Sequence, residues 1–288
     1  MTKRVLLIGH PLGHSISPAF QQAALDHCSL DARYEAMDVD AAALPGAVEA
    51  LRDPRVMGAN VTVPHKEAVV PLLDGLTEEA RLMGAVNTIV NSAGTLVGHN
   101  TDAAGFLRAL RERAAFEARG KRALLLGAGG AARAVAVALA SEGVESIAVA
   151  NRSLERAQAL VEMIRPMVPL AEAIPLQPGS LAPVAARSQI IVNCTSLGMR
   201  GGPGPEETPL GAALIPAHAL VCDLVYNPPE TPLLREAALA GARVLGGLPM
   251  LVYQGAASFE LWTGKEAPIE VMLEAAERAI REWHLVES

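Results

Sequence analysis

Lysine, cysteine and aromatic residues are all scarce in this chain of 288 residues. The three cysteines, Cys28, Cys194 and Cys222, are odd in number and show no C-x-x-C spacing. That pattern argues against a disulfide framework or a cysteine zinc site, and it predicts reduced core thiols in a cytoplasmic protein. Aromatic residues make up 3% of the chain, the net charge is −7, and no basic stripe with interleaved aromatics occurs. Nucleic-acid binding is therefore disfavoured.

Long apolar runs are also missing. No stretch of about 18 apolar residues occurs, which predicts no membrane span, and the apolar run Val5–Ile8 is too short for a signal peptide. Core material is nevertheless ample, since hydrophobic residues make up 51% of the sequence and its length favours two domains. We expect a soluble cytoplasmic enzyme with a small-molecule substrate. The sequence leaves open whether it forms a homodimer.

A glycine turn follows the apolar stretch that begins at Ala123. Gly127, Gly129 and Ala132 fit the G-x-G-x-x-G/A pattern, and an Ala-rich helix over 131–140 follows them. In a dinucleotide-binding fold the first glycine permits the tight turn, the second lets the backbone approach a pyrophosphate, and the third small residue lets helix and strand pack closely. The helix N-terminus adds free N–H groups for an anion. The alternative is a tight strand–helix turn without a ligand.

The end of the next predicted strand, 146–150, indicates which dinucleotide binds. NAD-binding folds usually place an acid there for the ribose 2′-hydroxyl. This chain has Asn151, Arg152 and Ser153 instead, with no acid before Glu155. A guanidinium suits a 2′-phosphate, so the pattern favours NADP(H). In the alternative reading Arg152 only pairs with Glu155.

Strands and helices alternate along the chain, which predicts an α/β fold with a parallel sheet and right-handed crossovers. Strands are expected at 4–9, 33–39 and 57–63, and a hairpin at 86–98. We place a substrate-binding and catalytic domain at residues 1–102 and a Rossmann-like nucleotide domain at 103–247. The residues themselves leave open which domain the last helices, within 248–288, pack on. A helical stretch is expected at 67–73, and loops are expected at 166–178 and 201–209.

Lys66 is the candidate acid/base of the first domain. It follows Pro64 just past the end of a buried strand, where open α/β sheets bind ligands. Only four of the 24 basic residues are lysines, and lysine, unlike arginine, can lose its proton when its environment allows. The alternative is a solvated lysine at a helix start.

Other polar groups also fall at strand ends. Ser15 and Ser17 precede a helix and could hold a small carboxylate, although Ser17 would also serve as a helix N-cap. Asn87 and Asp102 lie at the base of the predicted hairpin, where Asp102 could instead only cap the following helix. His10 and His14 lack a carboxylate or cysteine cluster to complete a site, so no metal is predicted.

These residues together carry a family resemblance: the chain resembles the shikimate dehydrogenases. The resemblance rests on sequence blocks that occur in the family's order over nearly the whole chain: Ser15-Ile-Ser17, Asn60-Val-Thr-Val-Pro-His-Lys66, Ala85-Val-Asn87-Thr, Asn100-Thr-Asp102, Gly127-Ala-Gly-Gly130, Asn151-Arg152, Asn193-Cys-Thr-Ser-Leu-Gly-Met199, Asp223-Leu-Val-Tyr226-Asn-Pro and Gln254. The resemblance implies that the C-terminal helices return to the N-terminal domain. One departure is Ser153, where the family usually has threonine.

The resemblance also implies roles for individual residues. Lys66 and Asp102 would form the catalytic pair. The substrate would be bound by Ser15, Ser17 and Tyr226 at its carboxylate and by Thr62, Asn87 and Gln254 at its ring hydroxyls. The pyrophosphate would lie at Gly127, Ala128, Gly129, Gly130 and Ala131, the 2′-phosphate at Asn151, Arg152 and Ser153, and the nicotinamide near Thr195, Gly198, Met199, Leu224 and Gly247.

The implied reaction is the reversible NADPH-dependent reduction of 3-dehydroshikimate to shikimate, a step of chorismate and aromatic amino-acid biosynthesis, without a metal. Burial would favour the neutral amine of Lys66 and a neighbouring Asp102 would favour its charged form, so which residue carries the proton stays open. A quinate/shikimate dehydrogenase using NAD, a non-catalytic dinucleotide sensor and a Rossmann-like methyltransferase are the alternatives. The missing acid beside Arg152 argues against an NAD-dependent quinate/shikimate dehydrogenase. A non-catalytic sensor would have no use for Lys66 with Asp102, and in a methyltransferase Arg152 would meet no phosphate.

Overall fold

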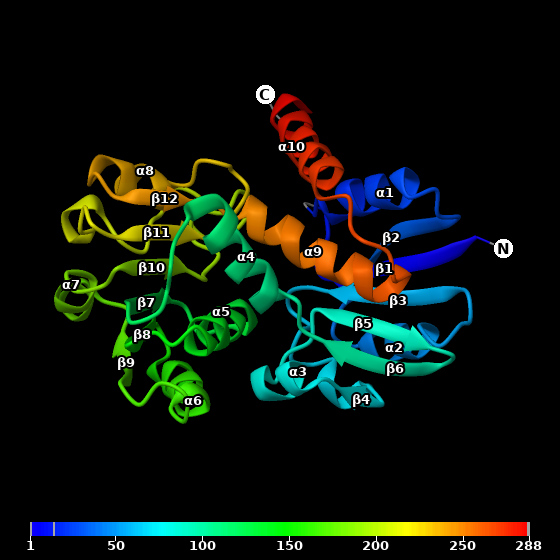
Figure 1. Ribbon diagram of the computed structural model, residues 1–288, viewed down its shortest axis with the longest axis horizontal. Helices are drawn as coiled ribbons and strands as arrows, with labels where there is room; N and C mark the ends of the chain where they lie inside the picture. The colour runs from blue at the N-terminus through cyan, green and yellow to red at the C-terminus, as the bar shows by residue number, and fades with distance from the viewer. Residues whose placement is uncertain (1, 14, 287–288) are drawn as a thin grey trace. The chain divides into compact units, whose positions relative to one another are not determined.

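The computed structural model describes residues 2–13 and 15–286. They form two compact units. The first contains the chain up to Gly105 and again from Leu251 onward, and the second spans Phe106–Met250 (Figure 1). Each unit contains one six-stranded sheet with helices, so the predicted α/β class is confirmed.

A mostly parallel sheet forms the frame of the first unit, in the strand order β2-β1-β3-β5-β6-β4. Its strands are β1 (Lys3–Gly9), β2 (Ala32–Asp38), β3 (Val56–Val61), β4 (Gly75–Leu76), β5 (Thr88–Ser92) and β6 (Thr95–His99). Strand β1 pairs in parallel with β2 and β3, whereas β5 runs antiparallel to β3 and to β6. The predicted hairpin is therefore confirmed as β5–β6.

The helices of the first unit come from both ends of the chain. They are α1 (Ser17–His27), α2 (Leu44–Ala50), the 3-10 turn η1 (Val70–Leu72), α3 (Glu78–Met83), most of α9 (Leu248–Thr263) and α10 (Ile269–Val286). Helix α10 packs against α1, and Trp262 Nε1 on α9 donates to the Ile89 carbonyl at 2.9 Å. The C-terminal helices thus return to the first unit, as the resemblance implied.

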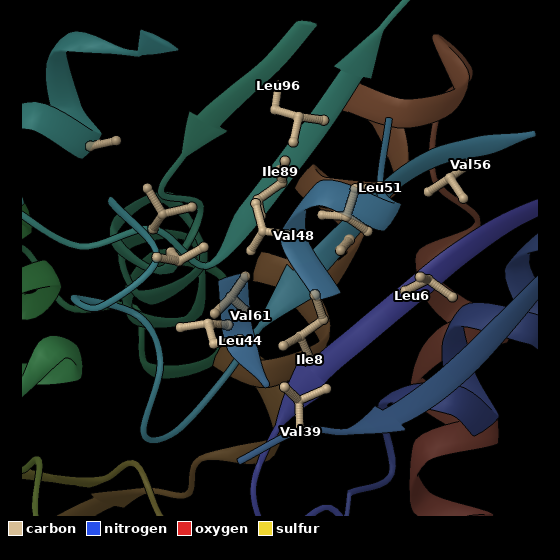
Figure 2. Close-up of a cluster of buried hydrophobic side chains, with 14 residues drawn as sticks. Leu6, Ile8, Val39, Leu44, Val48, Leu51, Val56, Val61, Ile89 and Leu96 are labelled. Atoms are coloured by element: carbon tan, nitrogen blue, oxygen red, sulfur yellow. The ribbon is translucent and has the colours of Figure 1, made fainter. Parts of the chain in front are cut away.

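One apolar cluster holds the sheet of the first unit against α2 and the segments around it (Figure 2). Its fully or almost fully buried members include Leu6, Ile8, Leu44, Val48, Leu51, Val61, Ile89 and Leu96. Alternate residues of β1 and β3 enter this cluster because side chains alternate between the two faces of a strand. The cluster fixes the strand ends from which the polar residues of the site emerge.

The second unit is a Rossmann-type sheet with all strands parallel, in the order β12-β11-β10-β7-β8-β9. Counted within the unit this is the 3-2-1-4-5-6 order of dinucleotide-binding folds. Its strands are β7 (Arg122–Leu126), β8 (Ser146–Asn151), β9 (Ala171–Pro175), β10 (Ile190–Asn193), β11 (Leu220–Asp223) and β12 (Arg243–Leu245). Its helices are most of α4 (Asp102–Ala114), α5 (Gly130–Ser141), α6 (Leu154–Ile164), α7 (Pro178–Ala185), the 3-10 turn η2 (Ala212–Leu214) and α8 (Pro232–Leu239).

Two local predictions were wrong, and each concerns a segment that contains a proline. A helix was expected over 67–73, but only the short turn η1 forms, because Pro71 lacks the N–H that a longer helix needs. A loop was expected over 166–178, yet β9 lies there. It is the edge strand of its sheet, the position at which a strand tolerates a proline such as Pro175. Among the described helices none is long and apolar enough to cross a bilayer.

Candidate active site

The segment after β3 holds Lys66 by its backbone on both sides. The buried His65 ring places Nε2 2.5 Å from the Val39 carbonyl, and because a carbonyl only accepts, this nitrogen carries the hydrogen. The Val86 N–H donates to the Lys66 carbonyl at 2.8 Å. Two neighbouring chain segments therefore fix where the Lys66 side chain starts.

Lys66 forms an ion pair with Asp102. Nζ lies 2.5 Å from Oδ2, and the side chains of Lys66 and Asp102 are 18% and 6% exposed. Asp102 is the first residue of α4, where the N-terminal end of a helix favours a carboxylate. The expectation that Asp102 lies just before the helix, as its N-cap, is therefore wrong by one residue. The Asp102 N–H donates to Asn100 Oδ1. A mostly buried lysine–carboxylate pair is a strong candidate for proton transfer.

Asn87 and Gln254 join this pair. Asn87 Nδ2 donates to Asp102 Oδ1 at 2.8 Å and to Gln254 Oε1 at 3.0 Å. Gln254 reaches the site from α9, and its Nε2 donates to the Leu251 carbonyl. Four residues predicted as site residues from distant parts of the sequence are thus in one hydrogen-bonded group.

Ser15, Ser17 and Thr62 lie in the segments that follow β1 and β3. Ser15 Oγ accepts from the Ser17 N–H at 3.3 Å. Helix α1 begins at Ser17 itself, and Ile16 occupies the N-cap position, so the prediction of Ser17 as N-cap is wrong. Within residues 2–13 and 15–286, no hydrogen bond joins the hydroxyls of these three residues to Lys66 or Asp102.

The loop after β1 is shaped by His10 and Asp38. His10 Nδ1 lies 2.5 Å from Asp38 Oδ1, and the Leu12 N–H donates to Asp38 Oδ2 at 3.1 Å. The hydrogen bond from His10 is the main reason why the pKa of Asp38 lies below its usual value. His14, the other histidine considered as a metal ligand, lies outside the described residues. In the part of the chain that is described, no group of three His, Cys, Asp or Glu side chains could hold a metal ion.

The glycine turn of the second unit has the geometry that its sequence predicted. Gly127 has φ +110°, and a Cβ there would lie 3.1 Å from both the Cys194 carbonyl carbon and Thr195 Cγ2. Ala132 is fully buried, which permits close packing of helix on strand. A Cβ on Gly129 would meet nothing within 4 Å, so the turn leaves open space beside the start of α5. Ala128, Gly130 and Ala131 complete the turn, whose free backbone N–H groups suit a pyrophosphate.

The end of β8 presents Arg152 to solvent. Asn151 Nδ2 donates to the Ser153 carbonyl at 2.9 Å, and Ser153 Oγ caps α6 by accepting from the Arg156 N–H. Arg152 is exposed and has no hydrogen bond or ion pair among residues that the structure describes, so the alternative pairing with Glu155 is not formed. Its guanidinium is available to an anion.

The segment after β10 is braced by Asn193. Its Oδ1 accepts from the N–H and the hydroxyl of Thr195, at 3.0 and 2.7 Å. Gly247 is held against the Leu224 carbonyl, where a Cβ would come within 2.4 Å of the oxygen. Gly198 has φ +82° and is followed by the partly exposed Met199. Only glycine fits at position 247 without moving this segment.

Tyr226 follows β11 and is half-buried. Burial raises the pKa of its phenol to about 12, so the hydroxyl keeps its hydrogen near neutral pH. A neutral phenol can donate a hydrogen bond to a carboxylate. That is the chemistry its predicted role requires.

Asp223, which sequence reasoning did not single out, is the buried centre of this region. Its Oδ1 accepts from Asn193 Nδ2 and the Val225 N–H, and its Oδ2 accepts from the Thr231 hydroxyl. Burial raises its pKa to about 6, although these hydrogen bonds act in the opposite direction. The sequence signal was available, since an acid at the end of a buried strand rarely lacks partners.

The free energy of unfolding should therefore fall as the pH rises. The fall is expected over the range in which Asp223 is ionised in the unfolded chain but still protonated in the folded protein. That range runs from the ordinary pKa of 3.8 to about 6. The expected loss is about 3 kcal/mol of unfolding free energy at most. In Asp223→Asn, which keeps the shape, this component should vanish. Melting temperatures of both proteins, measured every half unit from pH 4 to 7, should diverge over this range, and parallel curves would contradict the assignment.

Three comparisons with known proteins bear on this site. The family description "Shikimate dehydrogenase substrate binding domain" matches residues 7–89, "Shikimate / quinate 5-dehydrogenase" matches 109–197, and "Shikimate 5'-dehydrogenase C-terminal domain" matches 247–277. The shikimate dehydrogenase (NADP(+)) of Methanopyrus kandleri is 48% identical over 282 residues, 97% of each chain.

Solved structures of similar proteins point to the same family. The shikimate 5-dehydrogenase of Thermus thermophilus, crystallised with NADP(H) and shikimate, is 43% identical with a TM-score of 0.86 and covers 96% of this chain and 100% of its own. Quinate dehydrogenase from Corynebacterium glutamicum, crystallised with NAD, is 33% identical with a TM-score of 0.87, over 96% of this chain and 99% of its own.

A Rossmann-type unit in the same chain as a buried lysine–carboxylate site defines an α/β oxidoreductase. With the matches above, the chain belongs to the shikimate dehydrogenase family, which consists of oxidoreductases of aromatic amino-acid biosynthesis.

Proposed function

We propose that this enzyme catalyses the reversible NADPH-dependent reduction of 3-dehydroshikimate to shikimate. The observation that carries the proposal is the Lys66–Asp102 pair, bonded through Asn87 to Gln254. NADP(H), when bound, supplies or accepts the hydride. The glycine turn fits its pyrophosphate, and the exposed Arg152 fits its 2′-phosphate.

Lys66 is proposed to handle the proton. In the direction of reduction the carbonyl oxygen of the substrate gains negative charge, and the Lys66 ammonium donates a proton to it. Asp102 Oδ2 lies 2.5 Å from Nζ and thereby holds the ammonium in position. Asn87 and Gln254 are assigned to ring hydroxyls, together with Thr62. The carboxylate is assigned to Ser15, Ser17 and Tyr226.

NADP(H) is proposed over NAD because β8 ends without an acid and because the Arg152 guanidinium has no ion-pair partner in the part of the chain that the structure describes. Quinate remains the competing substrate, since the family contains a quinate dehydrogenase crystallised with NAD. We propose a cytoplasmic enzyme that acts on shikimate and 3-dehydroshikimate without a metal or a nucleic-acid partner.

One assay tests the proposal: the purified protein is given shikimate or quinate with NADP⁺ or NAD⁺, and absorbance of the reduced cofactor is followed. We expect the highest kcat/KM for shikimate with NADP⁺. A preference for quinate with NAD⁺ would instead support the competing function. Turnover with none of the four combinations would leave only a dinucleotide-binding role.

Ser15→Ala should raise the KM for shikimate more than it lowers kcat, because ground state and transition state share the carboxylate contact. A charge-assisted hydrogen bond is worth about 1.5–3 kcal/mol, so a rise of about tenfold or more is expected. Ser92→Ala, an exposed serine at the end of β5, is the matched control. If an analogue without the carboxylate loses as much as shikimate does, Ser15 serves the fold and not the substrate.

A further inference from the structure

The amide of Asn87 has one definite orientation. The Thr101 N–H donates to its Oδ1 at 2.8 Å, and a backbone N–H can only donate. Its Nδ2 faces Asp102 Oδ1, a carboxylate oxygen, at 2.8 Å. Exchange of the amide oxygen and nitrogen would set donor against donor and acceptor against acceptor at these two contacts. The orientation of the amide is thereby determined by chemistry as well as by shape.

Two buried hydroxyl groups support this orientation of the Asn87 amide. Thr88 Oγ1 donates to Asn87 Oδ1 at 3.0 Å, and Ser258 Oγ lies 2.7 Å from Thr88 Oγ1. Both residues are fully buried. Ser258 donates its single hydroxyl hydrogen to the Gln254 carbonyl at 3.0 Å, so its oxygen faces Thr88 as an acceptor, and Thr88 Oγ1 shares its own hydrogen between Asn87 Oδ1 and Ser258 Oγ. The two hydroxyls thereby link α9 to β5 and to the Asn87 amide.

The side chain of Asn60 also helps to fix the positions of these two hydroxyls. Asn60 Nδ2 donates to Ser258 Oγ at 3.1 Å and lies 3.2 Å from Thr88 Oγ1, while Asn60 Oδ1 accepts from the Tyr34 hydroxyl at 2.7 Å. Burial raises the pKa of Tyr34 far above its usual value, so this phenol stays a donor. The network therefore stays intact without any ionised group other than the Lys66–Asp102 pair it leads to.

We propose that Thr88 and Ser258 are positioning residues for the reaction. Their hydroxyls hold the Asn87 amide with its nitrogen toward Asp102, and this leaves Asp102 Oδ2 for Lys66. Neither hydroxyl is assigned a contact with substrate or cofactor. The inference rests on the proposed role of the Lys66–Asp102 pair and adds the residues that orient this pair.

The test compares Thr88→Val, which keeps the volume and removes the hydroxyl, with Thr88→Ser, which keeps the hydroxyl. Loss of one neutral hydrogen bond should lower kcat for shikimate about 3- to 10-fold in Thr88→Val. Thr88→Ser should restore kcat to within about twofold of wild type, and the KM for NADP⁺ should be unchanged in both. Equal losses in both variants would overturn the proposal, because the methyl group and not the hydroxyl would then matter.

Ser258→Ala provides the second variant if Thr88→Val does not fold. Ser188→Ala is its matched control, since Ser188 is similarly buried and its hydroxyl bonds only to the Val184 carbonyl of its own segment. We expect Ser258→Ala to lower kcat and Ser188→Ala to affect only melting temperature. If the two variants behave alike, Ser258 has no positioning role.

A crystal structure of Thr88→Val, or of Ser258→Ala, separates this inference from the proposed function. The inference expects the Asn87 amide to rotate or to move away from Asp102 Oδ1. An amide that keeps its 2.8 Å contact would overturn the inference even if the enzyme reduces 3-dehydroshikimate as proposed. Conversely, a wild-type protein inactive on shikimate would overturn the proposed function and leave this structural result standing.

Discussion

Replacement of Lys66 by alanine should lower kcat by about 10²- to 10⁴-fold, the usual effect of a lost general acid or base. Lys66→Arg keeps a positive charge beside Asp102 but holds its proton too tightly to transfer it. Lys66→Arg should therefore be more stable than Lys66→Ala, but its turnover should stay low. Steady-state kinetics with shikimate and NADP⁺ give the answer, and kcat near the wild-type value in either variant would show that another group carries the proton.

Stability must be followed in the same experiment. Lys66→Ala leaves Asp102 buried without its charged partner, which typically costs about 3–5 kcal/mol. Assays should therefore be run well below the melting temperature of this variant. Lys3→Ala is a suitable control, because Lys3 lies in the same unit and its ammonium donates to the Pro54 carbonyl at the surface. Its kcat should stay at the wild-type value.

Arg152→Ala should lower kcat/KM for NADP⁺ by about 10- to 150-fold, because a charged hydrogen bond to the 2′-phosphate is worth about 1.5–3 kcal/mol. NAD⁺ lacks this phosphate, so its kcat/KM should hardly change. Arg165→Ala, an exposed arginine at the C-terminal end of α6, is the matched control and should leave both cofactors unaffected. The decisive quantity is the ratio of the two kcat/KM values before and after the change. An unmoved ratio would mean that the phosphate is held elsewhere.

Features set by neighbouring residues could be predicted from the sequence. The turn at Gly127 needs only a strand before it and a helix after it, and its φ of +110° follows from these local demands. The position of Lys66 just after β3 was predicted for the same reason, since a buried apolar run and a proline define the end of the strand. The roles assigned to these residues stay predictions.

Features that depend on distant segments could not be predicted. Thr88 and Ser258 are 170 residues apart, and neither the hairpin nor α9 alone shows that they are hydrogen-bonded. The hydrogen bond between Asn193 and Asp223 likewise joins residues 30 positions apart, at the ends of two neighbouring strands. Local sequence sets the ends of strands and the form of turns, whereas the fold decides which buried polar groups meet.

The first unit is interrupted in the sequence by the whole of the second unit, and this has a consequence for synthesis of the protein. Gln254 and Ser258 complete the hydrogen bonds of Asn87 and Thr88 only after residues 106–250 have left the ribosome. Domains generally fold in the order in which they emerge, so the nucleotide unit can fold on its own while the catalytic unit still lacks α9 and α10. A nascent or C-terminally truncated chain would thus bind a dinucleotide before it could use one, and reductase activity would appear only when the last helices are made.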